Sequence, residues 1–521
     1  MTNPDDQVPT PPPEPARELQ ARAAQGAVWT VLQTFISLGI GFLVNLVVAR
    51  YLGVADFGRL ATISLAVELS GTIFNLGVGN SLVQMGSKAH AAGRRDEVRG
   101  LLSGSQGYRV LAELPLSLLV VFYVVSSGNL PVSAILWIVL FGVVIPQLTA
   151  GAAACIGIEN RTARGAKLVL ASSVMVNLVT LAVVVMGGDA VMLWGARLAV
   201  GGVMPVVALS LVSRDYRLAV LRPRIPPRLG RPFWRYAIPV WAATTMGSLV
   251  SSRSEVLLLT WIGSAESVGT YALAFGLVTH VFAPANALTG PLLPAVSALR
   301  EVSAANAVPA FLRSVRIASS VAGVLAAVAI PALAALVPLL YGSGFASASP
   351  IVVVLGVLGI TQILIGPLYA FSQARLAGRL LLVSSVAALL VDVAIAVALI
   401  PRWGAWGAVA AIGAAGLVQV FVLARAEIAE LGLTWAGLGT VMANGLLAAP
   451  AALLAWGASA LIGSPLAGAI AAGGVGLIVW VGLARWLGSG LRESDVIVLC
   501  DALPGSAGRF LKPILGFVAH R

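Results

Sequence analysis

Single ionisable side chains stand inside long apolar stretches of this sequence. They are Glu68, Arg109 with Glu113, Arg197, Arg253 with Glu255, His280 and Asp392. A charge at mid-depth in a membrane costs about 2.5–3.5 kcal/mol or more, so such residues usually face a cavity or a partner. Arginine offers a planar fork of donors that fits a phosphate, and a buried carboxyl group can hold a proton or a cation. The arginines therefore predict an anion-binding site within a membrane. The carboxyl groups predict a site for a proton or cation that could drive transport.

Arg253 is the leading candidate for a phosphate contact, with Glu255 beside it. It stands roughly nine residues, or about 14 Å, from the outer end of its predicted helix, because an α-helix rises 1.5 Å per residue. That depth is too great for easy snorkelling to the surface. The competing interpretation is a structural ion pair with a glutamate such as Glu68.

The other arginines have stronger structural alternatives. Arg109 and Glu113 are four residues apart, so they can pair on one helix face. Arg197 lies one or two turns from the outer end of its helix, so it can either bind an anion or snorkel outwards. Arg50 ends the first predicted helix, where it can guard a cavity mouth or anchor the helix at the interface.

Two further residues are candidates for proton or cation chemistry. Asp392 lies near the middle of a predicted span, where it can bind a coupling ion or remain a neutral, hydrogen-bonded acid. His280 stands alone, and a lone histidine is more often packed and hydrogen-bonded than a ligand. We therefore take Asp392 as the ion-coupling candidate.

The elements that must position these residues are apolar helices. The chain has 521 residues, of which 59% are hydrophobic and 10% charged, and its mean hydropathy is +0.95. Soluble domains average about 45–50% apolar and 25% charged residues, so lipid must be the solvent for most of this chain. We expect an all-α integral membrane protein with 14 spans, near residues 27–49, 58–84, 101–125, 131–155, 166–187, 191–212, 236–262, 270–298, 314–340, 350–373, 380–400, 404–424, 435–462 and 465–487.

Positive charge marks one side of the predicted membrane protein. If the N-terminus is cytoplasmic, most of the 33 Lys and Arg residues fall in cytoplasmic segments, and only Arg50, Arg59 and Arg402 fall in outer loops. Such an excess is typical of cytoplasmic loops, so we expect both termini in the cytoplasm and the chain in a bacterial inner membrane. The spread of charge over every inner loop argues against nucleic-acid binding. The basic and aromatic segment 213–235 is typical of contact with anionic lipids.

The first six predicted helices resemble the next six. Val28-Trp29 aligns with Val240-Trp241, and residues 167–174 align with 379–386 at the same spacing. Each half has an even number of helices, so the repeats are parallel, and parallel repeats bind substrate at their interface. The predicted divisions are a disordered N-terminal tail (1–26), an N-lobe (27–212), a basic linker (213–235), a C-lobe (236–424), two added helices (425–487) and a cytoplasmic tail that can lie on the membrane surface (488–521).

Several motifs in this order resemble the polysaccharide flippase branch of the multidrug/oligosaccharidyl-lipid/polysaccharide exporter superfamily. They cover most of residues 26–430, and together they are fairly specific. The motifs are Val48-Ala-Arg-Tyr-Leu-Gly-Val-Ala-Asp-Phe-Gly58, Asn75-Leu-Gly-Val-Gly79, Ser252-Arg-Ser-Glu255, Val268-Gly-Thr-Tyr-Ala-Leu-Ala274, Pro291-Leu-Leu-Pro294, Tyr341-Gly-Ser-Gly-Phe-Ala-Ser-Ala-Ser-Pro350 and Leu399-Ile-Pro-Arg-Trp-Gly-Ala-Trp-Gly-Ala408.

This resemblance implies two six-helix lobes around a cationic cavity and transport by alternating access. It also implies an undecaprenyl-diphosphate-linked oligosaccharide as substrate, moved from the cytoplasmic to the outer leaflet. The charged residues inside the predicted spans and at their ends supply the candidate substrate-binding residues: Arg253, Arg50, Arg197, Arg109, Glu255 and Glu68. One departure affects ion coupling: many relatives have an aspartate after the arginine of the seventh helix, where this chain has Ser254-Glu255.

Enzymatic function is not expected from this sequence. No paired carboxylates, metal cluster or glycine-rich phosphate loop with lysine lies on an aqueous side, and no cofactor or ATP-binding domain is indicated. The alternatives that remain open are a cation-coupled multidrug exporter, a lipid II-type flippase and a scaffold subunit of a cell-envelope complex. Besides the lipid-linked glycan, the expected partners are anionic lipids of the inner leaflet and glycan polymerase or assembly proteins.

Overall fold

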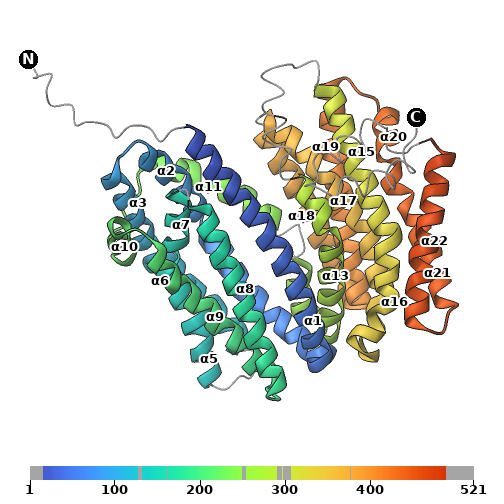
Figure 1. Cartoon of the computed structure of the whole chain (residues 1–521), viewed down its shortest axis with the longest axis horizontal. Helices are drawn as coiled ribbons and strands as arrows, with labels where there is room; N and C mark the ends of the chain where they lie inside the picture. Colours follow the sequence, from blue (N-terminus) through green and yellow to red (C-terminus); the bar gives the residue numbers. More distant parts are fainter. Residues whose placement is uncertain are drawn as a thin grey trace, which may run out of the picture. The chain divides into compact units, whose positions relative to one another are not determined.

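The computed structural model describes residues 16–126, 132–159, 161–248, 254–289, 296, 307–375 and 377–488. Within these ranges the chain is helical and forms no strand, which confirms the all-α prediction. It divides into two compact units: unit 1 contains residues 1–52 and 60–245, and unit 2 contains residues 53–59 and 246–521. In Figure 1 the helices of both units are coloured by their position in the sequence, from blue at the N-terminal end to red at the C-terminal end.

Unit 1 is built from helices α1 to α11. Most of α1 belongs to this unit, and α11 extends past its boundary at Thr245 to Ser248. The helices are α1 (Ala16–Phe74), α2 (Val78–Ala91), α3 (Arg95–Tyr108), the π-helical turn η2 (Arg109–Glu113), α4 (Leu114–Ser126), α5 (Val132–Ile138), the π-helical turn η3 (Val139–Val144), α6 (Ile145–Thr149), α7 (Gly151–Ile158), α8 (Thr162–Val185), α9 (Ala190–Leu211), α10 (Arg214–Leu221) and α11 (Arg231–Ser248).

Unit 2 is built from helices α12 to α22. Helix α19 packs on α17 and α18, and α22 packs on α21 and α16. The helices are α12 (Ser254–Ile262), α13 (Ala265–Thr289), α15 (Ala307–Val324), the π-helical turn η6 (Leu325–Ala329), α16 (Ile330–Tyr341), the 3-10 turn η7 (Ser343–Phe345), α17 (Ala348–Ala374), α18 (Gly378–Trp403), α19 (Ala405–Leu431), α20 (Trp435–Leu446), α21 (Ala448–Ala460) and α22 (Pro465–Trp486).

Helix α1 joins two helical stretches across a kink, in agreement with the two helices predicted for its residues. It begins at Ala16, within the segment 1–26 that we expected to be a disordered tail, and it continues to Phe74. A kink at Gly53 interrupts it, where φ is +74°. Glycine adopts this conformation without steric penalty, so it allows the chain to bend between two helical stretches. The kink therefore lies within residues 49–58, where the sequence predicted the break between the first two helices.

The short segment after this kink, residues 53–59, packs within unit 2. A Cβ atom on Gly58 would collide with the backbone oxygen of Ala265, and a Cβ atom on Gly269 would collide with that of Val54. Phe57 packs edge-on against Phe345, with ring centroids 6.1 Å apart. Only glycine lets two helix backbones approach this closely, which explains both glycines in the sequence motifs.

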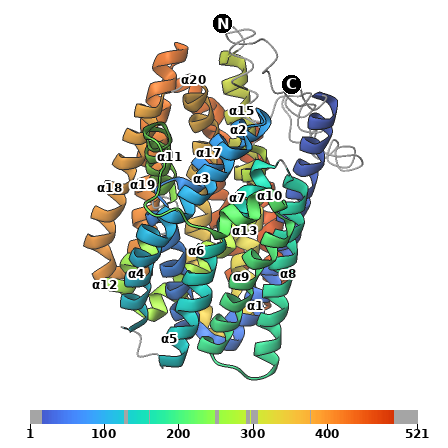
Figure 2. The same cartoon turned by 90° about the vertical axis from the view of Figure 1, so that its left-hand side faces the viewer.

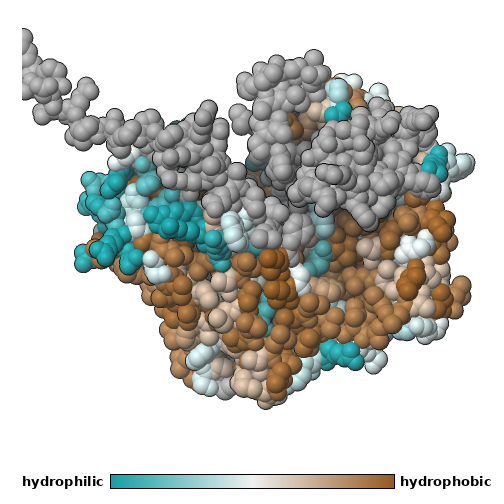
Figure 3. Space-filling view, viewed as in Figure 1, coloured by the Kyte–Doolittle hydropathy of each residue, from teal (hydrophilic) through white to brown (hydrophobic). Residues whose placement is uncertain are grey.

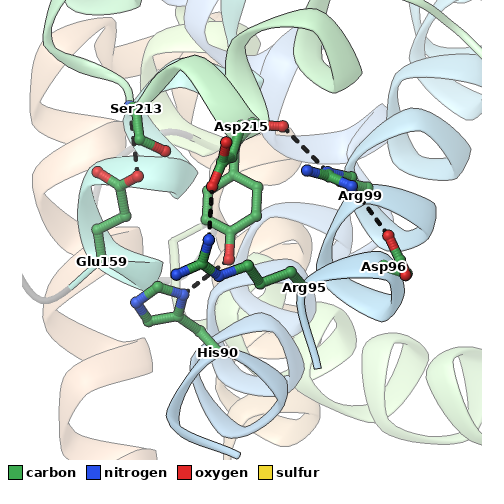
Figure 4. Close-up of polar contacts among 8 residues, drawn as sticks. His90, Arg95, Asp96, Arg99, Glu159, Ser213 and Asp215 are labelled. Atoms are coloured by element: carbon green, nitrogen blue, oxygen red, sulfur yellow. Dashed lines mark hydrogen bonds and ion pairs between the residues drawn. The ribbon is translucent and has the colours of Figure 1, made fainter. Parts of the chain in front are cut away.

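The basic segment 213–235 is ordered and docks on α3. Arg95 forms an ion pair with Asp215 at 3.0 Å, and the Nε atom of Arg99 donates to the Asp215 carbonyl at 3.3 Å. His90 at the end of α2 is hydrogen-bonded to Tyr216 at 2.8 Å, and Figure 4 shows these contacts together. Figures 1 and 2 show α2, α3 and α10 at the same end of unit 1.

The apolar surface of the protein fits a membrane environment. Among the described residues, 11 helices are long and apolar enough to cross a membrane, so the exact count of 14 stays a prediction. Figure 3 shows hydrophobic side chains over the flanks of the helices and a hydrophilic patch over the end of unit 1 that contains α2, α3 and α10. Several membrane-length helices with such flanks make this a multi-pass membrane protein.

Candidate functional site

Two predicted site residues, Glu255 and Asp392, meet in the interior of unit 2. Glu255 is the second residue of α12, and Asp392 lies near the middle of α18, which packs directly on α12. Both side chains are 0% exposed. The hydroxyl of Ser254 lies between them, donating to Asp392 at 2.6 Å and standing 3.4 Å from the Glu255 carboxylate. The structure therefore joins two acids that are far apart in the sequence.

A buried tyrosine completes this group, which we call the acid cluster: Ser254, Glu255, Tyr271 and Asp392. Tyr271 belongs to α13, is fully buried and lies within electrostatic range of both carboxylates. One oxygen of Glu255, one oxygen of Asp392 and the Tyr271 hydroxyl have no hydrogen-bond partner among the described residues. Stacking of Tyr271 against Phe275, with ring centroids 6.0 Å apart, fixes the phenol ring in this position.

The acid cluster has the chemistry of a proton or monovalent cation site. Two buried carboxylates next to each other repel, and no described Lys or Arg forms an ion pair with either of them. Burial of two neighbouring carboxylate charges is unfavourable, and a proton or a bound cation at the site would lower that cost. Among the described residues, no three His, Cys, Asp or Glu side chains come together to hold a metal ion.

In unit 1, Arg109 and Glu113 are buried but do not form the ion pair that their spacing suggested. They are the ends of the π-helical turn η2, whose wider winding changes the register expected for an α-helix. Asn75 donates to Glu113 at 3.4 Å and accepts from the Gly79 backbone at 3.0 Å. Arg109 Nε and one Glu113 oxygen lack hydrogen-bond partners among the described residues. The two side chains therefore interact electrostatically at a longer range than the direct ion pair that the α-helical spacing suggested.

Arg197 lies on α9, at a separate place in unit 1. The helix begins after Asp189, whose carboxylate caps it by accepting from the Met192 backbone at 2.8 Å. Arg197 follows about two turns later and lines a pocket of about 270 Å³ together with residues of α1 and α8. The arginine is partly buried, and its side chain therefore belongs to an internal polar space of this unit.

Among the remaining candidates that the structure describes, Arg50, Glu68 and His280 belong to neither site. Arg50 and Glu68 are exposed on α1. Arg253, the leading candidate from the sequence, lies outside the described residues. His280 is partly buried and bonds through Nδ1 to the Gly276 carbonyl at 2.6 Å, one helical turn away, in agreement with a packed histidine. The proposed pairing of Arg253 with Glu68 consequently stays a prediction.

The sequence reasoning missed the uncharged members of both sites. Tyr271 of the acid cluster stood in a motif but was not marked as functional, and Asn45 and Asn177 of the Arg197 pocket were not noticed. An amide or hydroxyl side chain in the middle of an apolar helix is a signal, because it needs a partner in lipid. A search for such residues beside the charged ones would have found these three.

Comparison with known proteins gives both a family and a fold. The family model described as "Polysaccharide biosynthesis protein" matches residues 23–300. The sequence has no significant match among curated proteins.

Solved structures of low sequence identity share the fold. A lipid II flippase, MurJ, in an inward closed conformation has a TM-score of 0.59 and 12% identity, covering 88% of this chain and 99% of its own. An inward-facing multidrug resistance MATE family transporter of the MOP superfamily has a TM-score of 0.58 and 15% identity, covering 77% and 99%. A MOP superfamily transporter from Pyrococcus furiosus, described as having a binding pocket of reverse polarity, has a TM-score of 0.52 and 15% identity, covering 78% and 96%.

Proposed function

Because this chain belongs to the polysaccharide biosynthesis protein family and has the fold of MOP superfamily transporters, we propose that it is a lipid-linked saccharide flippase. The proposed substrate is an anionic, undecaprenyl-diphosphate-type oligosaccharide. The protein moves it from the cytoplasmic to the outer leaflet of a bacterial inner membrane by alternating access, with both chain termini in the cytoplasm. The lipid II flippase among the structural neighbours supports a substrate with a lipid-borne phosphate.

The acid cluster is the observation that carries the proposal, because it supplies an energy input. Glu255 and Asp392 hold a charge-balancing proton or cation inside unit 2, with the Ser254 hydroxyl 2.6 Å from Asp392. Gain or loss of that ion changes the net charge of a fully buried site, and so shifts the equilibrium between conformations that bind it differently. An inside-negative potential also favours outward movement of an anion, by about 2.3 kcal/mol per charge per 100 mV.

A transport assay with and without an ion gradient, run on the wild type and on an Asp392→Asn variant, tests this function. Asparagine keeps the shape of the side chain but cannot carry the negative charge that binds the ion. Wild-type protein in proteoliposomes should flip a fluorescent undecaprenyl-diphosphate oligosaccharide, and an inward proton or sodium gradient should accelerate it. The variant should lose this acceleration while it still exchanges substrate slowly without a gradient.

A matched control is Glu430→Gln, which removes an exposed carboxylate of unit 2 outside the acid cluster. It should keep the full response to the gradient. Wild-type protein that moves no lipid-linked saccharide would refute the flippase proposal itself. Asp392→Asn protein that still responds to both gradients, with the membrane potential held constant, would refute coupling through the acid cluster.

A further inference from the structure

The Arg197 pocket lies between three helices of unit 1, and its lining combines polar side chains with the valines Val44, Val48 and Val176. It takes Ser37, Gly41 and Asn45 from one face of α1, Ser173 and Asn177 from one face of α8, and Arg197 from α9. Its volume of about 270 Å³ is near the lower end of the roughly 300–1,000 Å³ that is typical of small-molecule sites. It therefore suits a small head group.

Arg197 makes no hydrogen bond or ion pair with any residue that the structure describes. The polar groups around it are hydroxyls and amides, and none of the pocket residues is acidic. Asn177 is only 8% exposed, and its amide nitrogen donates to the Ser173 carbonyl at 2.7 Å, which holds this side chain in the pocket wall. A cation among neutral hydrogen-bonding groups is an environment that selects for an anion.

The pocket lies below the helix ends and inside the apolar part of the unit. At 1.5 Å per residue, Arg197 stands about 10 Å along α9 from its start, and Asn177 about 12 Å from the end of α8. Asn45 stands about 12 Å before the kink of α1 at Gly53. These three polar side chains converge at one depth, whereas a snorkelling arginine would need no such partners.

We propose that the Arg197 pocket binds a phosphate together with the sugar attached to it, as a head-group site within unit 1. The Arg197 guanidinium forms the fork to the phosphate, and the amides and hydroxyls of α1 and α8 bind sugar hydroxyl groups. This site is separate from the acid cluster of unit 2. The inference rests on the proposed function, since it assigns the polar head of the transported lipid to a defined place.

Equilibrium binding to the full-length protein in detergent tests the pocket. The probes are farnesyl diphosphate, inorganic diphosphate and farnesol, which separate a lipid-borne phosphate from a free one and from the lipid alone. We expect both diphosphates to bind and farnesol not to bind. Arg197→Gln should weaken diphosphate binding on the order of tenfold or more, as expected for the loss of a charge-assisted hydrogen bond, and Arg197→Lys should weaken it less.

A second pair of variants tests the pocket without changing any charge. A Cβ atom on Gly41 or on Gly39 has no neighbour within 4 Å, so α1 can accept a side chain at either position. Gly41 lines the pocket and Gly39 does not. Gly41→Leu should fill the pocket and reduce diphosphate binding, whereas Gly39→Leu should leave it unchanged. Gel filtration and thermal unfolding of every variant show whether the fold is kept.

The results separate this inference from the proposed function. If folded Arg197→Gln and Gly41→Leu proteins bind both diphosphates as well as the wild type does, the pocket is not a phosphate site, even if the protein flips lipid-linked saccharide. If binding depends on Arg197 but wild-type proteoliposomes move no saccharide, the pocket stands and the flippase proposal fails. Binding of farnesol as tight as that of farnesyl diphosphate would also overturn the inference.

Discussion

Arg375, at the end of α17, forms two ion pairs that differ in their surroundings. Its guanidinium lies 2.8 Å from Glu427, which is 0% exposed, and 3.1 Å from Glu430, which is 47% exposed. Ser372 also donates to Glu427 at 2.6 Å. The buried carboxylate depends on these partners because it has no access to water, whereas the exposed one does not.

Arg375→Gln should therefore destabilise unit 2 by about 3–5 kcal/mol, since it leaves the Glu427 charge buried without its ion partner. Glu430→Gln should change stability by about 0–1 kcal/mol, because it removes only the exposed pair. Unfolding in detergent, followed by circular dichroism, measures both. Equal effects of the two substitutions would show that the burial of Glu427 does not matter.

At the scale of single residues, the sequence identified the buried charged residues but not the side chains that surround them in the fold. Glu255 and Asp392 were each selected because a carboxylate in an apolar run is unusual, and this reasoning was sound for each residue alone. Their meeting depends on the packing of α12 against α18, two helices that are distant in the sequence. Hydrophobic periodicity shows which face of a helix is apolar, but it does not show which helix covers that face.

Among the elements, α10 adds a buried aromatic contact to the ion pair and hydrogen bond by which it docks on α3. Tyr216 is 2% exposed and bonds to His90 at 2.8 Å. Burial of the phenol raises the pKa of Tyr216 above its usual value of 10.0, because the phenolate would lose its hydration. The nearby Arg95 cation opposes this rise, and the Glu159 and Asp215 carboxylates add to it. The folded state therefore favours the neutral tyrosine.

This pKa shift predicts a loss of stability at high pH. The contribution of Tyr216 is fully present below about pH 10 and declines as the pH rises towards its raised pKa, because the unfolded chain releases the proton first. The wild type should become less stable than at neutral pH across this range, and Tyr216→Phe should show a smaller decline. Unfolding curves between about pH 8 and 11 compare the two slopes. Identical slopes would mean that Tyr216 is not the group responsible.

Element boundaries were predicted well where helices end at charged turns and poorly where the winding changes inside a helix. The end of α18 at Trp403 and the start of α19 at Ala405 lie close to the predicted boundaries of the spans 380–400 and 404–424. The break at Gly53 was predicted by the gap between the spans 27–49 and 58–84, but the three π-helical turns were not foreseen. A π-helical turn inserts one residue into an otherwise α-helical pattern, and such an insertion does not change composition or hydropathy.

For the whole molecule, the distribution of basic residues predicts the orientation in the membrane. Met186 is an exposed residue between α8 and α9 on the predicted outer side, and Asp96 is an exposed residue of α3 on the predicted inner side. In a chain with Cys155 and Cys500 replaced by serine, Met186→Cys should react with a membrane-impermeant maleimide in intact cells. Asp96→Cys should react only after the cells are permeabilised. The opposite labelling pattern would reverse the proposed direction of transport.

The close approach of Gly58 and Gly269 makes this contact sensitive from both of its sides. Gly58 meets the backbone at Ala265, and Gly269 meets it at Val54, so the same contact is made twice with the roles exchanged. A Cβ atom at either position would stand 2.1 Å from a backbone oxygen of the opposite helix. Alanine at either glycine should therefore force the two helices apart, and neither substitution can be relieved by a change at the other position.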